Sequence, residues 1–174
     1  MIVLLCGTQS PVNIGMILRS AEAFEAKVVI VDTFATLADQ GARRRVSDFA
    51  CGAFERLSPP VWQDYSGLDG LGGRRITAVA GGIGTPVDGF AWREDDILLI
   101  GNEYDGIPPL LADRADASIV IPMSRRHNPK PPSHRPIDAS RVTQIANPGA
   151  PALNAAVAAS IILSHAFAKR LETV

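Results

Sequence analysis

The chain has 174 residues and a mass of 18.5 kDa, which is enough for one domain with a complete hydrophobic core. Hydrophobic residues make up 47% of it and charged residues 20%, a balance that excludes a largely disordered protein. Because 17 Lys and Arg residues are offset by 18 Asp and Glu residues, any nucleic-acid-binding surface must come from a local basic patch.

Short apolar runs alternate with helical patterns along the chain. Residues 2–6 are an unbroken apolar run, residues 14–24 carry apolar side chains at helical spacing, and residues 27–31 are a second apolar run. Together they predict a βαβ unit with a right-handed crossover. Further strands are predicted at 76–79, 97–100 and 118–121. We therefore expect an α/β fold with a mostly parallel sheet that has helices on both faces.

Three other segments differ from this pattern. Residues 35–56 are predicted to be partly helical, with the basic cluster at 43–45 on or beside the helix. Residues 124–151 contain six prolines, which exclude a long helix, and five basic residues against one acidic residue. A loop of this length within a domain is usually functional or disordered. Residues 153–171 are predicted to form a helix that is buried within the domain or against a second chain.

Several classes of protein and site are not expected. The longest apolar run, 155–163, is about half the ~20 residues that a bilayer crossing needs, so no membrane association is predicted. Met1 leads directly into apolar residues, unlike a secretory signal, and we expect a cytoplasmic protein. The three histidines are not closely paired with Cys or carboxylates, so no metal is expected. Cys6 and Cys51 are predicted to be reduced thiols that act as small hydrophobic residues.

Common cofactor and hydrolase motifs do not match the chain. The glycine-rich turn at 81–84 follows a predicted strand but lacks the G-x-G-x-x-G spacing of a dinucleotide site. No P-loop and no G-x-S-x-G nucleophile elbow occurs anywhere. These absences disfavour nicotinamide or flavin binding, P-loop chemistry and serine hydrolysis.

Three segments place polar side chains beside the carboxyl ends of predicted strands, where parallel sheets bind ligands. The first, residues 10–21, contains the pattern N-x-G-x-x-x-R that begins at Asn13. The second is G-N-E-x-x-G at 101–106, followed by I-P-M at 121–123. The third, L-N-x-x-V-A, begins at Leu153.

In this order the segments resemble the three motifs of the TrmH/SpoU family, within the SPOUT superfamily of RNA methyltransferases. The resemblance spans nearly the whole chain, from Leu4 to about Lys169. It implies a single SPOUT-type domain over residues 1–174 whose C-terminal part forms a deep trefoil knot, a rare exception among folds. The basic, proline-rich segment at 124–151 would be an insertion in that domain.

The family resemblance also implies an activity. Such proteins use S-adenosylmethionine, leaving S-adenosylhomocysteine, to methylate RNA, most often at a ribose 2′-OH. Because no separate RNA-binding domain precedes the first motif, a tRNA substrate is favoured over rRNA and a homodimer is expected. The apolar helix predicted at 153–171 would contribute to the dimer interface.

Matching positions carry the family's functional residues onto this chain. The implied cofactor-binding residues are Gly101, Ile121, Met123, Leu153 and Asn154. The implied catalytic residues are Asn13, Arg19, Glu103 and Asn154. Candidate RNA contacts are Arg43, Arg44, Arg45, Arg125, Arg126, Lys130 and Arg135. Since few aromatic residues flank these basic positions, we expect contacts to phosphate to dominate, with binding that weakens as salt rises.

Simpler structural roles are open for three of these residues. Asn13 could cap the first helix, Arg19 could lie on a solvated helix face, and Glu103 could be an exposed turn residue. A guanidinium has a pKa above ~12 and is a poor proton acceptor, so we expect Arg19 to clamp an RNA phosphate rather than remove a proton. The proton acceptor is left open among phosphate, water and solvent.

The chain departs from the family pattern near the third motif. Ala152 and Ala156 stand where members often carry hydroxyl side chains, and 28 residues separate Met123 from Ala152 where members usually have a handful. An alternative function is therefore a non-catalytic RNA- or ligand-binding homologue that keeps the knotted fold.

Overall fold

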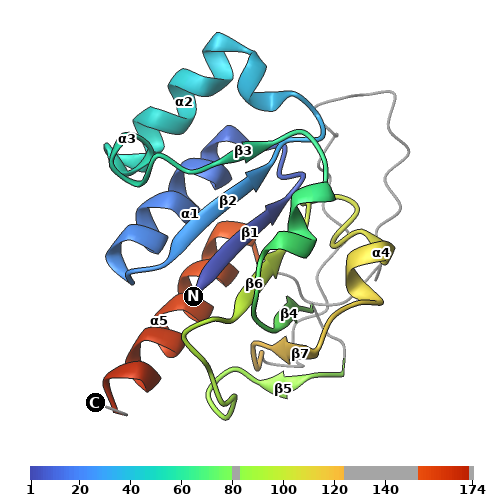
Figure 1. The fold of residues 1–174 in the computed structure, drawn as a ribbon. Helices are drawn as coiled ribbons and strands as arrows, with labels where there is room; N and C mark the ends of the chain where they lie inside the picture. The colour runs from blue at the N-terminus through green and yellow to red at the C-terminus, as the bar shows by residue number, and fades with distance from the viewer. Residues whose placement is uncertain (80–82, 124–152, 173–174) are drawn as a thin grey trace.

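The computed structural model describes residues 1–79, 83–123 and 153–172 (Figure 1). The insertion predicted at 124–151 lies outside the described residues, and so do the first two positions of the glycine-rich turn. Four candidate RNA contacts fall in that insertion and are likewise not described: Arg125, Arg126, Lys130 and Arg135.

Within the described residues, seven strands form one sheet in the order β3-β2-β1-β6-β4-β7-β5, and their pairings are all parallel. The strands are β1 (Ile2–Cys6), β2 (Lys27–Val31), β3 (Val61–Trp62), β4 (Arg75–Ala78), β5 (Thr85–Pro86), β6 (Ile97–Ile100) and β7 (Ala117–Val120). This confirms the predicted α/β fold and all five predicted strands, with β4 and β7 beginning one residue earlier than expected. The short strands β3 and β5 were missed because two residues carry no periodic signal.

The two longest helices fall where apolar side chains dominate the sequence. The helices are α1 (Pro11–Ala23), α2 (Gln40–Ala50), α3 (Ala53–Leu57), α4 (Pro109–Ala112) and α5 (Ala155–Leu171), with 3-10 helices η1 (Thr36–Ala38) and η2 (Ser66–Gly70). The predicted C-terminal helix is confirmed as one unbroken element. The basic cluster at 43–45 lies in the first half of α2, as expected.

The two faces of the sheet are covered unequally. Side chains of β1 alternate between the faces, so Val3 and Leu5 join the larger core, which α1 and α5 cover, while Leu4 and Cys6 join a smaller one (Figure 1). Among the described residues, only short helical segments cover the second face, through Leu68 of η2 and Leu111 of α4. Helices lie on both faces, as predicted, with the longer ones on the face of the larger core.

Helices α1 and α2 cross in direct main-chain contact at Gly15. A Cβ atom built on Gly15 would lie 2.6 Å from the carbonyl oxygen of Val46 and 2.8 Å from Cβ of Phe49. Such distances are too short for real side chains, so glycine at this position is what allows α2 to approach α1.

We predict that Gly15→Ala lowers the midpoint temperature of thermal unfolding, measured by circular dichroism. Alanine is the better helix former by up to ~1 kcal/mol, but forcing the two helices apart costs about 1–3 kcal/mol. Gly41→Ala in α2 is the matched control, because its Cβ would meet only the Asp39 Oδ1 atom, at 3.2 Å, on a side chain that can move. An equal rise in midpoint for both variants would contradict the close crossing.

Candidate functional site

The Glu103 carboxylate lies at the N-terminus of α1, in the loop that follows β6. It accepts hydrogen bonds from the main-chain N–H groups of Gln9, at 3.2 Å, and Ser10, at 3.3 Å. It also accepts one from Nδ2 of Asn13, at 2.7 Å. Negative charge is favoured at a helix N-terminus, where main-chain N–H groups have no partner within the helix. Glu103 is half-buried and bound to three donors, so it is not an exposed turn residue.

Asn13 is buried inside the first turn of α1, with 4% of its surface exposed. The N-cap of α1 is Ser10, whose Oγ accepts from the Asn13 N–H at 3.3 Å, so the cap role considered for Asn13 belongs to another residue. The Asn13 side chain instead points in two directions. Its Nδ2 donates to Glu103, and its Oδ1 accepts from Nδ2 of Asn154 at 3.0 Å.

Asn154 is the N-cap of α5. Its Oδ1 accepts from the N–H groups of Ala156, at 2.9 Å, and Val157, at 3.4 Å, while its Nδ2 reaches Asn13. One chain of hydrogen bonds therefore runs from Glu103 through Asn13 to Asn154. It unites the three polar segments that the sequence analysis singled out, although the last two residues are 141 positions apart.

Asn102 is a structural residue of this edge that the sequence analysis did not single out. Its Nδ2 donates to the Gly7 carbonyl at 2.6 Å, and its Oδ1 accepts from the N–H groups of Tyr104, at 2.8 Å, and Asp105, at 3.3 Å. It thereby ties the loop after β6 to the loop after β1. The signal available in the sequence was its place between a strand-ending glycine and Glu103.

Gly101 allows a close approach of main chain from its own loop. A Cβ atom there would clash with the main chain of Gly106 and Ile107, which folds back over Gly101. Gly106 itself has a φ of 72°, in the left-handed region that glycine tolerates. The space beside Gly101 is thus filled by its own loop.

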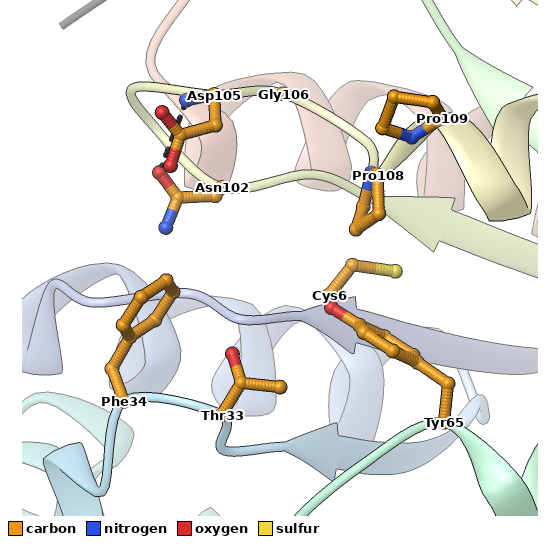
Figure 2. Close-up of a pocket in the computed structure, with 9 residues that line it drawn as sticks. All are labelled: Cys6, Thr33, Phe34, Tyr65, Asn102, Asp105, Gly106, Pro108 and Pro109. Carbon is orange, nitrogen blue, oxygen red and sulfur yellow. Dashed lines mark hydrogen bonds between the residues drawn. The ribbon is translucent and has the colours of Figure 1, made fainter.

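The remaining cofactor candidates lie along the same edge. Strands β6 and β7 both pair with β4, so Gly101 and Ile121 follow the carboxyl ends of strands that flank a common neighbour. Met123 is half-buried, and Leu153, which is 37% exposed, directly precedes Asn154. None of these four residues lines the cavity of about 290 Å³ shown in Figure 2, so their convergence on one pocket stays a prediction.

Arg19 lies on the exposed side of α1, six residues after Asn13. Its Nη1 is 3.5 Å from Sγ of Cys51, which ends α2 in a left-handed conformation with a φ of 53°. Cys51 is exposed, so the prediction of two hydrophobic thiols is wrong for it. The prediction holds for Cys6, where burial raises the thiol pKa to about 12.

The basic cluster on α2 faces solvent. Arg43, Arg44 and Arg45 are all exposed, and the Arg43 guanidinium stacks over the Phe54 ring at 5.5 Å from its centroid. Within the described ranges, no group of three or more His, Cys, Asp or Glu side chains could hold a metal ion. No helix in the same ranges is long and apolar enough to cross a bilayer.

Comparisons with known proteins agree with this geometry. The model of the SpoU rRNA Methylase family matches residues 1–128. A tRNA (cytidine(34)-2′-O)-methyltransferase of Ancylobacter novellus is 29% identical over 158 residues, which cover 89% of this chain and 84% of the relative.

Solved structures share the fold. The SpoU methyltransferase AviRb from Streptomyces viridochromogenes, in complex with AdoMet, superposes with a TM-score of 0.71 at 24% identity. That match covers 98% of this chain but only 58% of AviRb, so the chain spans less than two thirds of that protein. A structure described as giving insight into the 2-OH methylation of C/U34 on tRNA has a TM-score of 0.69 at 20% identity, with 98% and 96% covered.

The parallel sheet and the three linked loops at its carboxyl edge define an α/β domain of the SpoU methyltransferase fold. Because the family match extends over nearly three quarters of the sequence, the chain belongs to the SpoU rRNA methylase family.

We predict that Asn13→Asp lowers the free energy of unfolding at pH 7 and that the loss shrinks as the pH falls toward ~4. The new carboxylate would face Glu103, and two like charges raise the pKa of the pair in the folded state above the unfolded values. The native state then holds a proton more tightly than the unfolded chain does, so the loss grows as the pH rises through the raised pKa. Urea denaturation over this pH range measures the free energy of unfolding of the variant and of the unmodified protein.

Asn13→Ala is the control for this experiment. It removes the same hydrogen bonds without adding a charge, at a cost of about 1–3 kcal/mol. Identical pH profiles for the two variants would show that Glu103 does not face residue 13.

Proposed function

We propose that the protein is an S-adenosylmethionine-dependent RNA methyltransferase that transfers a methyl group to a ribose 2′-OH, with tRNA as the substrate. The observation that carries the proposal is the hydrogen-bonded chain from Glu103 through Asn13 to Asn154, which joins all three motif segments at one edge of the sheet. Membership of the SpoU family and similarity to a tRNA 2′-O-methyltransferase support it.

The residues near this edge fit the methyl donor. Leu153 keeps 37% of its surface exposed and Met123 is only half-buried, which leaves apolar surface for an adenine ring. The main chain beside Gly101 and Ile121 offers N–H and C=O groups for its polar edge. When bound, the donor supplies an electrophilic methyl group on a sulfonium. In this proposal Gly101, Ile121, Met123, Leu153 and Asn154 hold it.

The polar chain and Arg19 have separate roles in this proposal. Asn13, Glu103 and Asn154 hold the loops in register, and the accessible sides of Glu103 and Asn154 orient the ribose. Arg19 is exposed and permanently charged, so it clamps an RNA phosphate and aligns the 2′-OH without accepting its proton. Positioning of this kind lowers a reaction barrier by several kcal/mol, without any proton chemistry.

The RNA-binding surface of the proposal begins at α2, where Arg43, Arg44 and Arg45 face solvent. The basic insertion at 124–151 would extend it. A domain of this size needs a second copy to build a long RNA surface, which supports a homodimer. Val157 on α5 and Met16 on α1, exposed by 41% and 39%, are apolar positions suited to that contact.

We further propose that residues 1–174 are one SPOUT-type domain and that its C-terminal part is threaded as a deep trefoil knot. Two observations support this threading. Strand β4 lies between β6 and β7, and the contact between Asn154 and Asn13 brings the start of α5 back to the first motif. A tRNA substrate agrees with a cytoplasmic protein.

Nucleoside mass spectrometry tests the function directly. Purified protein is incubated with tRNA or rRNA and S-adenosylmethionine that carries a deuterated methyl group, and the RNA is digested to nucleosides. We expect a labelled 2′-O-methyl nucleoside from tRNA. Label from rRNA alone would overturn the tRNA preference. No label from either, together with no calorimetric binding of S-adenosylmethionine, would favour the non-catalytic homologue.

We predict that Arg19→Ala abolishes methyl transfer while leaving the S-adenosylmethionine affinity nearly unchanged, because the side chain contacts RNA and not adenosine. Arg19→Lys should recover little activity, since lysine keeps the charge but loses the two-pronged geometry. The control is Arg93→Ala, which should retain full activity. Arg93 is also exposed, but it precedes β6 and so lies at the end of that strand away from the motif loops. Rates within about threefold of the unmodified protein for Arg19→Ala would refute the phosphate clamp.

A further inference from the structure

A cavity of about 290 Å³ opens at the end of β1, between the segments that follow β2, β3 and β6 (Figure 2). One wall is formed by Asn102, Gly106 and Pro108 from the loop after β6, and the opposite wall by Phe34 and Tyr65. We call this space the Phe34 cavity. Its volume lies at the lower limit of small-molecule pockets, ~300–1,000 Å³, which suits a single planar ring system better than a whole nucleotide cofactor.

The Phe34 cavity adjoins the Glu103 cluster through the loop after β6, which contributes residues to both. Asn102, in its wall, directly precedes Glu103 and donates to the Gly7 carbonyl at 2.6 Å. Two residues further along the loop after β1, the Gln9 N–H group donates to Glu103 at 3.2 Å. A ligand that spans a cavity and an adjoining polar site fits this arrangement.

Phe34 is held half-exposed by a built turn. The buried Asp32 carboxylate accepts from the N–H groups of Thr36 and Leu37, both at 2.8 Å, and Ala35 takes a left-handed φ of 54°. A Cβ on Gly7 would lie 3.1 Å from Cε2 of Phe34, so the ring packs against bare main chain. The left-handed conformation of Ala35 costs roughly 1–2 kcal/mol. The turn that requires it leaves the Phe34 ring 40% exposed.

The Phe34 cavity has the chemistry of a site for an uncharged ring. Burial raises the pKa of both Cys6 and Tyr65 to about 12, so both stay neutral and Cys6 is no thiolate. The lining of the cavity contains no Lys, Arg or His side chain that could pair with a phosphate group. The sugar–phosphate chain of a bound nucleotide therefore belongs outside the cavity, toward the Glu103 cluster.

We propose that the Phe34 cavity receives one unstacked nucleobase of the RNA substrate, with its ring against Phe34 and its ribose toward Glu103. Bases of single-stranded RNA are commonly splayed out and stacked on aromatic side chains, at about 1–3 kcal/mol per base. The inference rests on the proposed RNA methyltransferase function and adds to it a place for the base beside the reacting ribose.

Nuclear magnetic resonance with cytidine 5′-monophosphate as the probe tests the inference without methyl transfer. The ring signals of Phe34 and Tyr65 should shift with cytidine 5′-monophosphate and not with ribose 5-phosphate. Phe34→Ala should weaken the affinity for cytidine 5′-monophosphate about tenfold. Phe49→Ala is the matched control, because Phe49 is exposed by 44% on α2 outside the cavity lining, and it should leave the affinity unchanged.

Two results would overturn the base site: ring signals that stay unmoved at millimolar nucleotide, or equal shifts with S-adenosylhomocysteine, which would make the cavity part of the cofactor site. Failure of the proposed function is distinguishable. If the unmodified protein methylates no RNA but the ring signals shift with cytidine 5′-monophosphate, the base site is supported and the proposed methyltransferase function is refuted. The base site alone is refuted by a different set of results: RNA is methylated, the ring signals do not shift, and Phe34→Ala keeps the full rate.

Discussion

The amide of Asn13 is shared between a carboxylate and a second amide, and the geometry of the carboxyl edge depends on that sharing. Glu103 is half-buried, and burying a polar side chain is costly unless its oxygens find donors. Two donors come from the main chain at the start of α1 and the third from Asn13. Since Asn13 also accepts from the cap of α5, the loop after β6 and the starts of both helices are held together.

The same constraint links the edge to the core. Helices α1 and α5 pack side by side on one face of the sheet, where Ser20 and Ser160 share a hydrogen bond of 2.7 Å. Their N-terminal ends therefore arrive at the carboxyl edge together. Ala156, one of the two positions where the family resemblance led us to expect a hydroxyl, is completely buried at the start of α5. A methyl group there joins the core, and the α5 cap is made without it.

Much of this architecture followed from the sequence, for identifiable physical reasons. Strands such as 97–100 are buried on both faces and read as unbroken apolar runs, so their ends were placed within one residue. The motif residues Asn13, Glu103 and Asn154 were singled out, but not their mutual hydrogen bonds. Those depend on a contact between positions 141 apart, which no local pattern encodes.

Other features could not be seen in the sequence. Asn102 joins two loops through a single long-range hydrogen bond to the Gly7 carbonyl. The Phe34 cavity depends on a turn built by Asp32, which in the sequence is one acidic residue after a strand. The close main-chain approach at Gly101 was not visible either, because the segment that contacts it comes from five residues further along the chain.

A double-mutant cycle on Asn13 and Asn154 is the most direct measurement of the central claim that one hydrogen-bonded chain joins the motifs. The free energies of unfolding of Asn13→Ala, Asn154→Ala and the double variant are compared with that of the unmodified protein. Contacting residues in one network are coupled by about 0.5–3 kcal/mol, so the double variant should lose less stability than the two single variants together. Losses that add within ~0.3–0.5 kcal/mol would contradict the account.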